Sequence, residues 1–151
     1  MKRKLKVTTE KWPIKGSFRI SRGSITEITV VKVSITENKF KGYGECRPYT
    51  RYNETPESVV SLIESVRTNI EEGLKNIELQ SLLPAGAARN AIDCALWDLE
   101  AKIKNKSISE LLKIPVARPR KTAFTLSIDT PENIKKAAKK ADSFSILKIK
   151  I

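Results

Sequence analysis

Histidine is absent from the 151-residue sequence, and its absence excludes several kinds of site. Without imidazole there can be no Ser-His or Cys-His nucleophile system, and most zinc sites are ruled out. Cysteine is scarce as well. Cys46 and Cys94 stand in unlike contexts, which favours two reduced thiols in a cytosolic protein over a disulfide. No cluster of other metal-ligating residues replaces the missing histidines.

Long apolar runs are missing too. No window of the sequence holds the roughly 18 uncharged apolar residues that a membrane span needs. The basic start at Lys2–Lys6 is not followed by the apolar segment of a secretory signal. We therefore expect a cytoplasmic protein without a membrane partner.

Negative charge is in short supply, because 29 lysines and arginines face 17 aspartates and glutamates, a net charge of +12. Residues 1–6 carry four positive charges, and residues 113–151 carry ten positive and three negative charges, so the middle is nearly neutral. No RNP, KH, zinc-finger or helix-turn-helix pattern accompanies this charge. A nucleic-acid partner is not expected, although a stand-alone basic binding module for nucleic acid or an acidic partner stays open as an alternative.

The sequence that is present has the composition of a globular protein, with 40% hydrophobic and 30% charged residues. Alternation of apolar and polar residues in the first part predicts a small antiparallel sheet. The expected strands are 5–12, closed by Pro13, then 18–21, 25–36 and 40–46, the last two joined by a polar turn at 37–39.

Helical signals follow the sheet. Thr55 is a good N-cap with Pro56 at the first helical position, and an apolar stripe at helical spacing runs from Val59 to Leu74. A second helix is predicted over 85–104, and its alanine- and glycine-rich first half would let another backbone approach closely. A capping box at Ser107 predicts a short third helix that ends before Pro115.

The end of the chain reads as a β-α-β unit, with strands at 122–128 and 145–151 around a helix at 131–141. Such strands are parallel and joined by a right-handed crossover. Parallel sheets are normally covered on both faces, so this unit requires further strands that the chain does not supply. The sequence therefore predicts an α+β domain followed by the opening of a β/α array.

The last strand carries two lysines on one face. Lys148 and Lys150 are two residues apart, about 6–7 Å at the Cα level, whereas Leu147, Ile149 and Ile151 project to the other face. Each ammonium group disfavours charging of its neighbour, and partial burial acts in the same direction. One of these amines could therefore be held neutral and act as a base.

Three motifs, taken together, resemble one known family. They are Gly42-Tyr43-Gly44-Glu45-Cys46-Arg47-Pro48-Tyr49, then Leu83-Pro84-Ala85-Gly86-Ala87-Ala88-Arg89-Asn90, and finally Leu147-Lys148-Ile149-Lys150. Over essentially all 151 residues the chain resembles the N-terminal portion of dipeptide epimerases of the L-Ala-D/L-Glu type, in the enolase superfamily. The resemblance implies an enolase-like capping domain at 1–117, then the start of a modified TIM-type (β/α)₇β barrel at 118–151, truncated after its second strand.

The resemblance also implies a chemistry. Lys150 matches the base that moves the α-proton of a dipeptide on one face, and Lys148 matches its companion. A second base and the acidic ligands of Mg²⁺, which stabilises the enediolate, lie on later barrel strands, so no metal ligand is expected in this chain. The chain alone is predicted to be inactive, and its expected partners are the dipeptide and the remainder of the barrel or another subunit.

Further residues match positions that bind the substrate. Thr125, on the first barrel strand, either faces the substrate or is a strand threonine with a packed methyl group. Two capping-domain loops, 21–25 and 48–54, would close over the substrate, with Arg22 meeting its carboxylate or solvating a hairpin corner, and Tyr52 on the second loop. Ile25 departs from close relatives, which carry an arginine about there for an acidic side chain, so a different dipeptide stays open.

Two further expectations accompany this interpretation. A muconate-lactonising or o-succinylbenzoate-synthase-like enzyme of the same superfamily is an alternative, because those enzymes use the same lysine pair. The apolar strand that ends at Ile151 presents an unpaired edge, so a homo-oligomer is expected.

Overall fold

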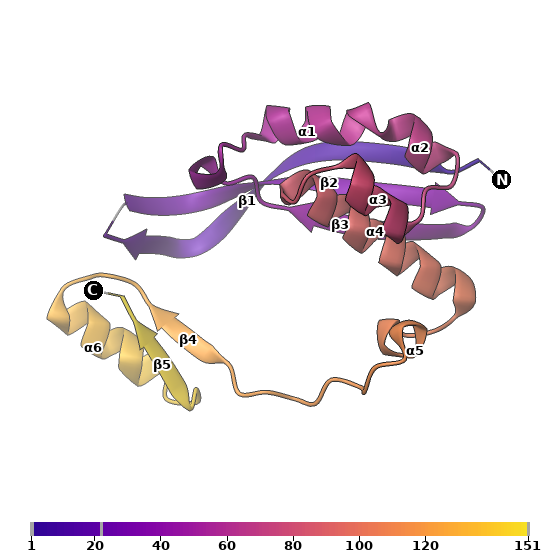
Figure 1. Ribbon diagram of the computed structural model, residues 1–151. Helices are drawn as coiled ribbons and strands as arrows, with labels where there is room; N and C mark the ends of the chain where they lie inside the picture. Colours follow the sequence, from indigo (N-terminus) through magenta and orange to yellow (C-terminus); the bar gives the residue numbers. More distant parts are fainter. Residues whose placement is uncertain (1, 22, 151) are drawn as a thin grey trace. The chain divides into compact units, whose positions relative to one another are not determined.

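The computed structural model describes residues 2–21 and 23–150, and the predicted α+β architecture is confirmed (Figure 1). The chain forms two compact units. The first contains the residues up to Trp12 together with Thr29–Val116, and the second contains Pro13–Ile28 together with the residues from Ala117 onward. The tip of the first hairpin therefore belongs with the end of the chain.

A three-stranded sheet in the order β1-β2-β3 forms the base of the first unit. Its strands are β1 (Lys4–Ile20), β2 (Gly23–Glu37) and β3 (Phe40–Cys46). Strands β2 and β3 are antiparallel, with a register that runs from Val31 opposite Cys46 to Glu37 opposite Phe40. Asn38 takes a positive φ of 53° in the turn, which asparagine tolerates better than most residues. The predicted hairpin is thus confirmed.

The prediction that Pro13 ends a strand is wrong. Strand β1 continues through Pro13 to Ile20, so the two expected runs, 5–12 and 18–21, are parts of one strand. Proline lacks the N–H that a central strand needs for its second neighbour, but an edge strand can leave that side unpaired. Strand β1 lies at the edge of the sheet, which removes the objection.

The helical stripe from Val59 to Leu74 belongs to two helices rather than one. They are α1 (Pro56–Ser65) and α2 (Arg67–Glu71), and the chain leaves helical geometry at Val66, where φ is −109° and ψ is 12°. The Thr55 cap is confirmed, because its side chain accepts a hydrogen bond from the Ser58 N–H at 3.1 Å. The apolar spacing holds across the break, since Val66 itself is buried.

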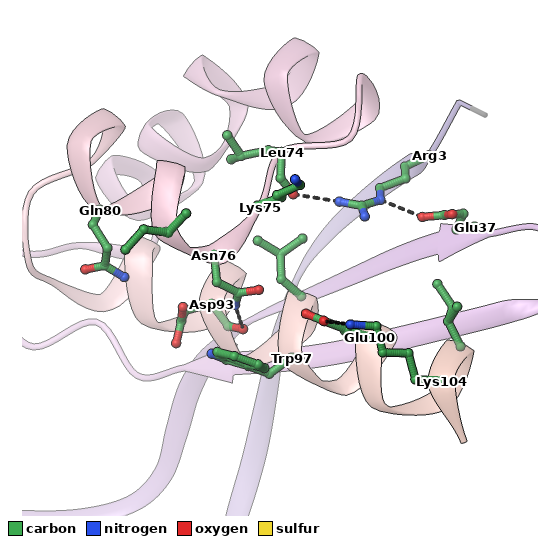
Figure 2. Close-up of a pocket in the computed structure, with 13 residues that line it drawn as sticks. Arg3, Glu37, Leu74, Lys75, Asn76, Gln80, Asp93, Trp97, Glu100 and Lys104 are labelled. Atoms are coloured by element: carbon green, nitrogen blue, oxygen red, sulfur yellow. Dashed lines mark hydrogen bonds and ion pairs between the residues drawn. The ribbon is translucent and has the colours of Figure 1, made fainter. Parts of the chain in front are cut away.

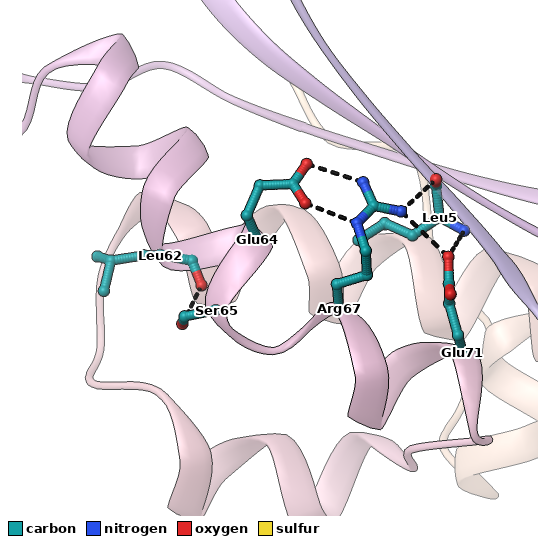
Figure 3. Close-up of polar contacts among 6 residues, drawn as sticks. All are labelled: Leu5, Leu62, Glu64, Ser65, Arg67 and Glu71. Atoms are coloured by element: carbon teal, nitrogen blue, oxygen red, sulfur yellow. Dashed lines mark hydrogen bonds and ion pairs between the residues drawn. The ribbon is translucent and has the colours of Figure 1, made fainter.

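Arg67 ties this break to the sheet (Figure 3). Its guanidinium donates two hydrogen bonds to the Glu64 carboxylate, at 2.6 and 2.8 Å, and one each to the Leu5 carbonyl at 2.9 Å and Glu71 at 3.0 Å. Glu71 also accepts a bond from the Leu5 N–H at 3.3 Å. The side chain therefore joins α1, α2 and β1 at the point where the helix is interrupted.

Two short helices flank the long helix of this unit. Helix α3 (Asn76–Leu82) was not predicted, and the long helix α4 (Ala87–Lys104) begins two residues later than predicted. Helix α5 (Ile108–Leu112) has the predicted capping box at Ser107. It ends at Leu112, and the next residue, Lys113, takes a left-handed φ of 54°, two residues before Pro115.

Helix α4 lies directly against β3 because β3 carries two glycines on the face that meets it. A Cβ built on Gly42 would lie 2.6 Å from the Leu99 Cβ, and one built on Gly44 would lie 2.8 Å from the Ala95 backbone nitrogen. Real side-chain atoms do not approach so closely. The small residues of α4 do let another backbone approach, as predicted, and the Gly42-Tyr43-Gly44 sequence serves this contact.

One hydrophobic core joins the sheet to its helices. Val31, Val33 and Ile35 of β2 are fully buried against the inward faces of α1 to α4, so these helices share one face of the sheet. In the described part of the chain, no helix combines the length and apolarity that crossing a membrane requires. The core of this unit is thus a packed layer of helices on a small sheet.

Candidate active site

The predicted lysine pair lies in the second unit, on a β-α-β motif. Strand β4 (Ala123–Leu126) pairs in parallel with β5 (Ile146–Ile149), and α6 (Pro131–Lys140) forms the crossover between them. Thr130 caps α6, because its hydroxyl accepts a hydrogen bond from the Asn133 N–H at 3.3 Å. The local sequence therefore determines where the crossover helix begins.

The two faces of this small sheet differ in character. Leu126 and Ala141 are each only 2% exposed, and the Phe124 ring lies 4.8 Å from the Phe144 ring, so this apolar face packs against the crossover. Side chains alternate between the faces of a strand. The opposite face of β4 therefore carries Thr125, which lies between two residues of the packed face.

The structure brings three of the predicted site residues together on that opposite face. Thr125 is the register partner of Lys148, and side chains of paired residues point to the same side of a sheet. Lys150 follows two residues later on the same side. Its backbone N–H donates to the Leu126 carbonyl at 3.1 Å, which extends the pairing one step beyond β5. Thr125, Lys148 and Lys150 thus line one face near the carboxyl end of β4.

The two lysines differ in exposure. Lys148 is exposed and Lys150 is partly buried, as is Thr125. Neither amine has a hydrogen bond or an ion pair with another described side chain, whereas Arg3, Arg67 and Lys102 each pair with a carboxylate. Both amines are therefore available to an incoming molecule rather than committed to a structural ion pair.

Ile25 lies in the tip of the β1–β2 hairpin, which belongs to the same unit, and it is partly buried. The tip meets the segment after β4 through Arg19, whose carbonyl accepts from the Ile128 N–H at 3.2 Å. Arg22 lies outside the described residues. The hairpin tip is therefore part of the same unit as the lysine face.

Tyr52 belongs to the first unit, in a loop that contains a short 3₁₀ helix, η1 (Thr50–Tyr52). The side chain is 72% exposed and its ring lies 5.9 Å from that of Tyr49. Glu54 fixes this loop by accepting hydrogen bonds from the Ala87 N–H at 2.7 Å and the Tyr49 N–H at 3.2 Å. Sequence reasoning missed Glu54, because a contact across 33 residues leaves no local signal.

The first unit also contains an open cavity of about 800 Å³ (Figure 2). Part of its polar lining is already paired: Arg3 bonds Glu37 and the Leu74 carbonyl, both at 2.7 Å, and Asn76 donates to the Asp93 carboxylate at 3.1 Å. These contacts join α3 to α4, and they join the start of the chain to the end of β2 and to the segment before α3. We therefore place the candidate active site at the lysine face and not in this cavity.

Among the described residues no group of three or more cysteine, aspartate or glutamate side chains is arranged to hold a metal ion. Asp93 and Asp98, which are five residues apart on α4, serve different partners. Asp93 accepts from Asn76, and Asp98 accepts from the Tyr43 N–H at 2.8 Å and from Lys102 at 2.6 Å. The described residues thus do not fit a Mg²⁺ ion by themselves.

Comparison with known proteins identifies the family of this chain. The family model of the mandelate racemase / muconate lactonizing enzyme N-terminal domain matches residues 2–113. An L-Ala-D/L-Glu epimerase from Escherichia coli (strain K12) is 47% identical over 136 residues, which are 90% of this chain and 42% of that protein. An N-acetyl-D-glutamate racemase from a Pseudoalteromonas species is 36% identical over 124 residues, 81% of this chain and 39% of that protein.

Solved structures give the same result for the fold. An enolase family member from Agrobacterium tumefaciens, described as homologous to dipeptide epimerases and holding sodium and L-Ala-L-Glu, superposes with a TM-score of 0.91 at 44% identity. A dipeptide epimerase from Methylococcus capsulatus, complexed with Mg and L-Arg-D-Lys, superposes with a TM-score of 0.85 at 29% identity. These matches cover 98% and 100% of this chain and 45% and 46% of the other chains.

The chain thus spans less than half the length of the relatives it matches, and those relatives are epimerases and racemases, which are isomerases. The antiparallel sheet with its helices matches the enolase capping domain, and the parallel pair β4–β5 starts the barrel. The predicted resemblance to dipeptide epimerases of the enolase superfamily is therefore confirmed, and the chain belongs to the mandelate racemase / muconate lactonizing enzyme family through the N-terminal domain of that family.

Proposed function

We propose that this chain is the N-terminal part of a dipeptide epimerase, an enzyme that moves a proton at the α-carbon of a dipeptide. The observation that carries the proposal is the face shared by Thr125, Lys148 and Lys150, at the carboxyl end of a strand pair that starts a barrel. In barrels of this kind the chemistry takes place at the carboxyl ends of the strands. We propose residues 1–117 as the capping domain and 118–151 as the start of the barrel.

Lys150 is assigned as the base on one face of the substrate. In its neutral form the amine takes the α-proton, so the C–H bond breaks, an N–H bond forms and the electron pair moves toward the adjacent carboxylate carbon. Partial burial favours Lys150 over the more exposed Lys148 for this role. Lys148 acts as its companion on the same face of the sheet. Thr125, the register partner of Lys148, faces the substrate.

The hairpin tip and the second loop support a proposal for the substrate class. Ile25 cannot form an ion pair with an acidic side chain, so we propose a dipeptide whose second residue is aliphatic or uncharged. Arg22 binds a substrate carboxylate, and Tyr52 closes over the substrate with its loop. A hydrophobic dipeptide epimerase from Roseobacter litoralis, 29% identical over 124 residues, is a relative with such a preference in its name.

Other components of the activity lie beyond the described residues. We propose that Mg²⁺ is bound by carboxylates outside this chain, where it would stabilise the enediolate. We also propose that residues 1–151 alone are inactive and that they assemble with the rest of a barrel, as a homo-oligomer in the cytoplasm. The unpaired edges of the two-stranded sheet and the two free thiols support assembly and a reducing compartment.

A hybrid enzyme tests this proposal. Residues 1–151 replace the matching part of the E. coli L-Ala-D/L-Glu epimerase, and the hybrid is incubated in D₂O with Mg²⁺ and L-Ala-L-Leu, L-Ala-L-Glu or their epimers. Deuterium at the α-carbon, measured by NMR, should appear fastest in L-Ala-L-Leu. Lys150→Met should lower exchange at least 10²-fold for one epimer and leave exchange of the other, because only one face loses its base.

The matched control is Lys139→Met, which removes an exposed lysine of α6 in the same unit. This variant should exchange both epimers at the rate of the unmodified hybrid. A folded hybrid that exchanges no dipeptide above background would contradict the proposed function, and equal rates for the two variants would contradict the role of Lys150. A clear preference for L-Ala-L-Glu would contradict the assignment of Ile25 to specificity.

A further inference from the structure

One residue of the hairpin tip is held at two points by the segment that follows β4. The backbone N–H of Arg19 donates to the Ser127 Oγ at 3.4 Å, and the Arg19 carbonyl accepts from the Ile128 N–H at 3.2 Å. The two partners are adjacent in the chain and 108 or 109 residues away from Arg19. We call this pair of hydrogen bonds the Arg19 bracket.

The Arg19 bracket lies next to Leu126, whose carbonyl binds the backbone of Lys150. Leu126, the residue before Ser127, is 2% exposed, and its carbonyl accepts the backbone N–H of Lys150 at 3.1 Å. One end of this short segment therefore holds the backbone of the predicted base, and the other end holds the hairpin tip. A shift of the segment would move both contacts together.

The segment beyond the bracket is fixed by the start of α6. The Asp129 carboxylate accepts from the Thr130 N–H at 2.7 Å and from the Asn133 side-chain amide at 2.9 Å. These bonds, with a smaller contribution from the Arg19 charge, hold the pKa of Asp129 below its ordinary value. Asp129 is therefore ionised at neutral pH, and it anchors the turn so that Ser127 meets Arg19 from a fixed position.

From these contacts we propose that Ser127 is a positioning residue whose hydroxyl holds the β1–β2 hairpin tip at the carboxyl end of β4, beside the backbone of Lys150. The other arm of the bracket is a bond between main-chain atoms, which no side-chain change removes. The bond to the Ser127 hydroxyl is thus the one that a substitution can remove. Without it the bracket keeps only its main-chain arm, and the tip, which includes Ile25, is held less firmly against the segment after β4.

The catalytic consequence rests on the proposed function, whereas the bracket itself does not. Hydrogen exchange of backbone amides in the full 151-residue chain tests the bracket directly. Ser127→Ala should speed exchange of the Arg19 amide about fivefold, the effect of losing one ordinary hydrogen bond. Ser127→Thr keeps a hydroxyl and should restore slow exchange, which a loss of general packing would not allow.

Ser17→Ala is the matched control, because it removes an exposed hydroxyl from the same hairpin. In this variant the Arg19 amide should exchange at the wild-type rate. The exchange rate of the Val33 amide in β2 should be unchanged in every variant. Equal Arg19 exchange in Ser127→Ala and wild type would overturn the proposal. Faster exchange throughout the chain in Ser127→Ala would also overturn it, because Ser127 would then be a general structural residue.

The hybrid enzyme separates positioning from chemistry. Ser127→Ala should raise KM for the dipeptide severalfold and leave kcat within about twofold, because the base Lys150 is unchanged while the loop is not. A fall in kcat with KM unchanged would overturn the positioning role. An inactive hybrid whose Arg19 amide still responds to Ser127→Ala would instead contradict the proposed function and support the bracket.

Discussion

Replacing Gly44 by alanine should destabilise the first unit strongly, because the added methyl group has no space. The Cβ would lie 2.8 Å from the Ala95 backbone nitrogen and in hard contact with the Ala91 carbonyl oxygen, so main-chain atoms of α4 would have to move. Gly44 does not adopt a positive φ, so backbone strain plays no part. A glycine-to-alanine change normally stabilises a protein by about 0.4–1 kcal/mol through the unfolded state. Overpacking of 1–3 kcal/mol or more should reverse that sign.

We expect a net loss of about 2 kcal/mol in the free energy of unfolding, which for a unit of this size lowers Tm by roughly 8 °C. Circular dichroism during thermal unfolding measures it. Glu45→Ala, at the exposed neighbouring position of β3, is the control and should shift Tm little. Ala91→Gly should not rescue Gly44→Ala, because the obstructing atom is a backbone oxygen. A Gly44→Ala variant that melts at or above the wild-type temperature would refute the reasoning.

Two further predictions concern titratable groups. Arg67 lowers the pKa of Glu64 in the folded state below its ordinary 4.5, so this stabilisation is complete above that pH and is lost as pH falls through the folded value. Arg67→Met should therefore lower Tm at pH 7, by an amount that corresponds to about 1 kcal/mol, and should have much less effect at about pH 3; a pH-independent gap would contradict the assignment. Burial raises the pKa of Cys46 to about 11, and also raises that of the more exposed Cys94. Iodoacetamide at pH 8 should modify Cys94 first in the folded chain, and mass spectrometry showing Cys46 modified first would contradict this.

Local signals in the sequence predicted the elements whose causes are local. The caps at Thr55 and Ser107 were recognisable because a capping side chain bonds a backbone N–H only three residues away. Helix α3 gave no comparable signal, because it has seven residues and buries only Leu79 among them. The prediction at Pro13 was wrong because the position of β1 at the edge of the sheet depends on distant residues.

In the candidate site, too, some features could be predicted from local sequence and others could not. Strand alternation was enough to put Lys148 and Lys150 on one face, and the register with Thr125 agrees with that expectation. The contacts that hold the loops were not predictable in this way. Glu54 reaches Ala87 across 33 residues, and Ser127 reaches Arg19 across 108. Nothing near either residue in the sequence identifies its partner, which only the folded chain brings within hydrogen-bonding distance.

The glycine contact between β3 and α4 has a consequence for how such a domain can diverge. Because main-chain atoms set the spacing at Gly42 and Gly44, exchange of side chains elsewhere on the helix does not alter it. Exposed side chains of the loop that follows β3, such as Tyr52, can therefore change without altering the distance between β3 and α4. The loops of such a domain can thus diverge in sequence while its central layer keeps the same dimensions.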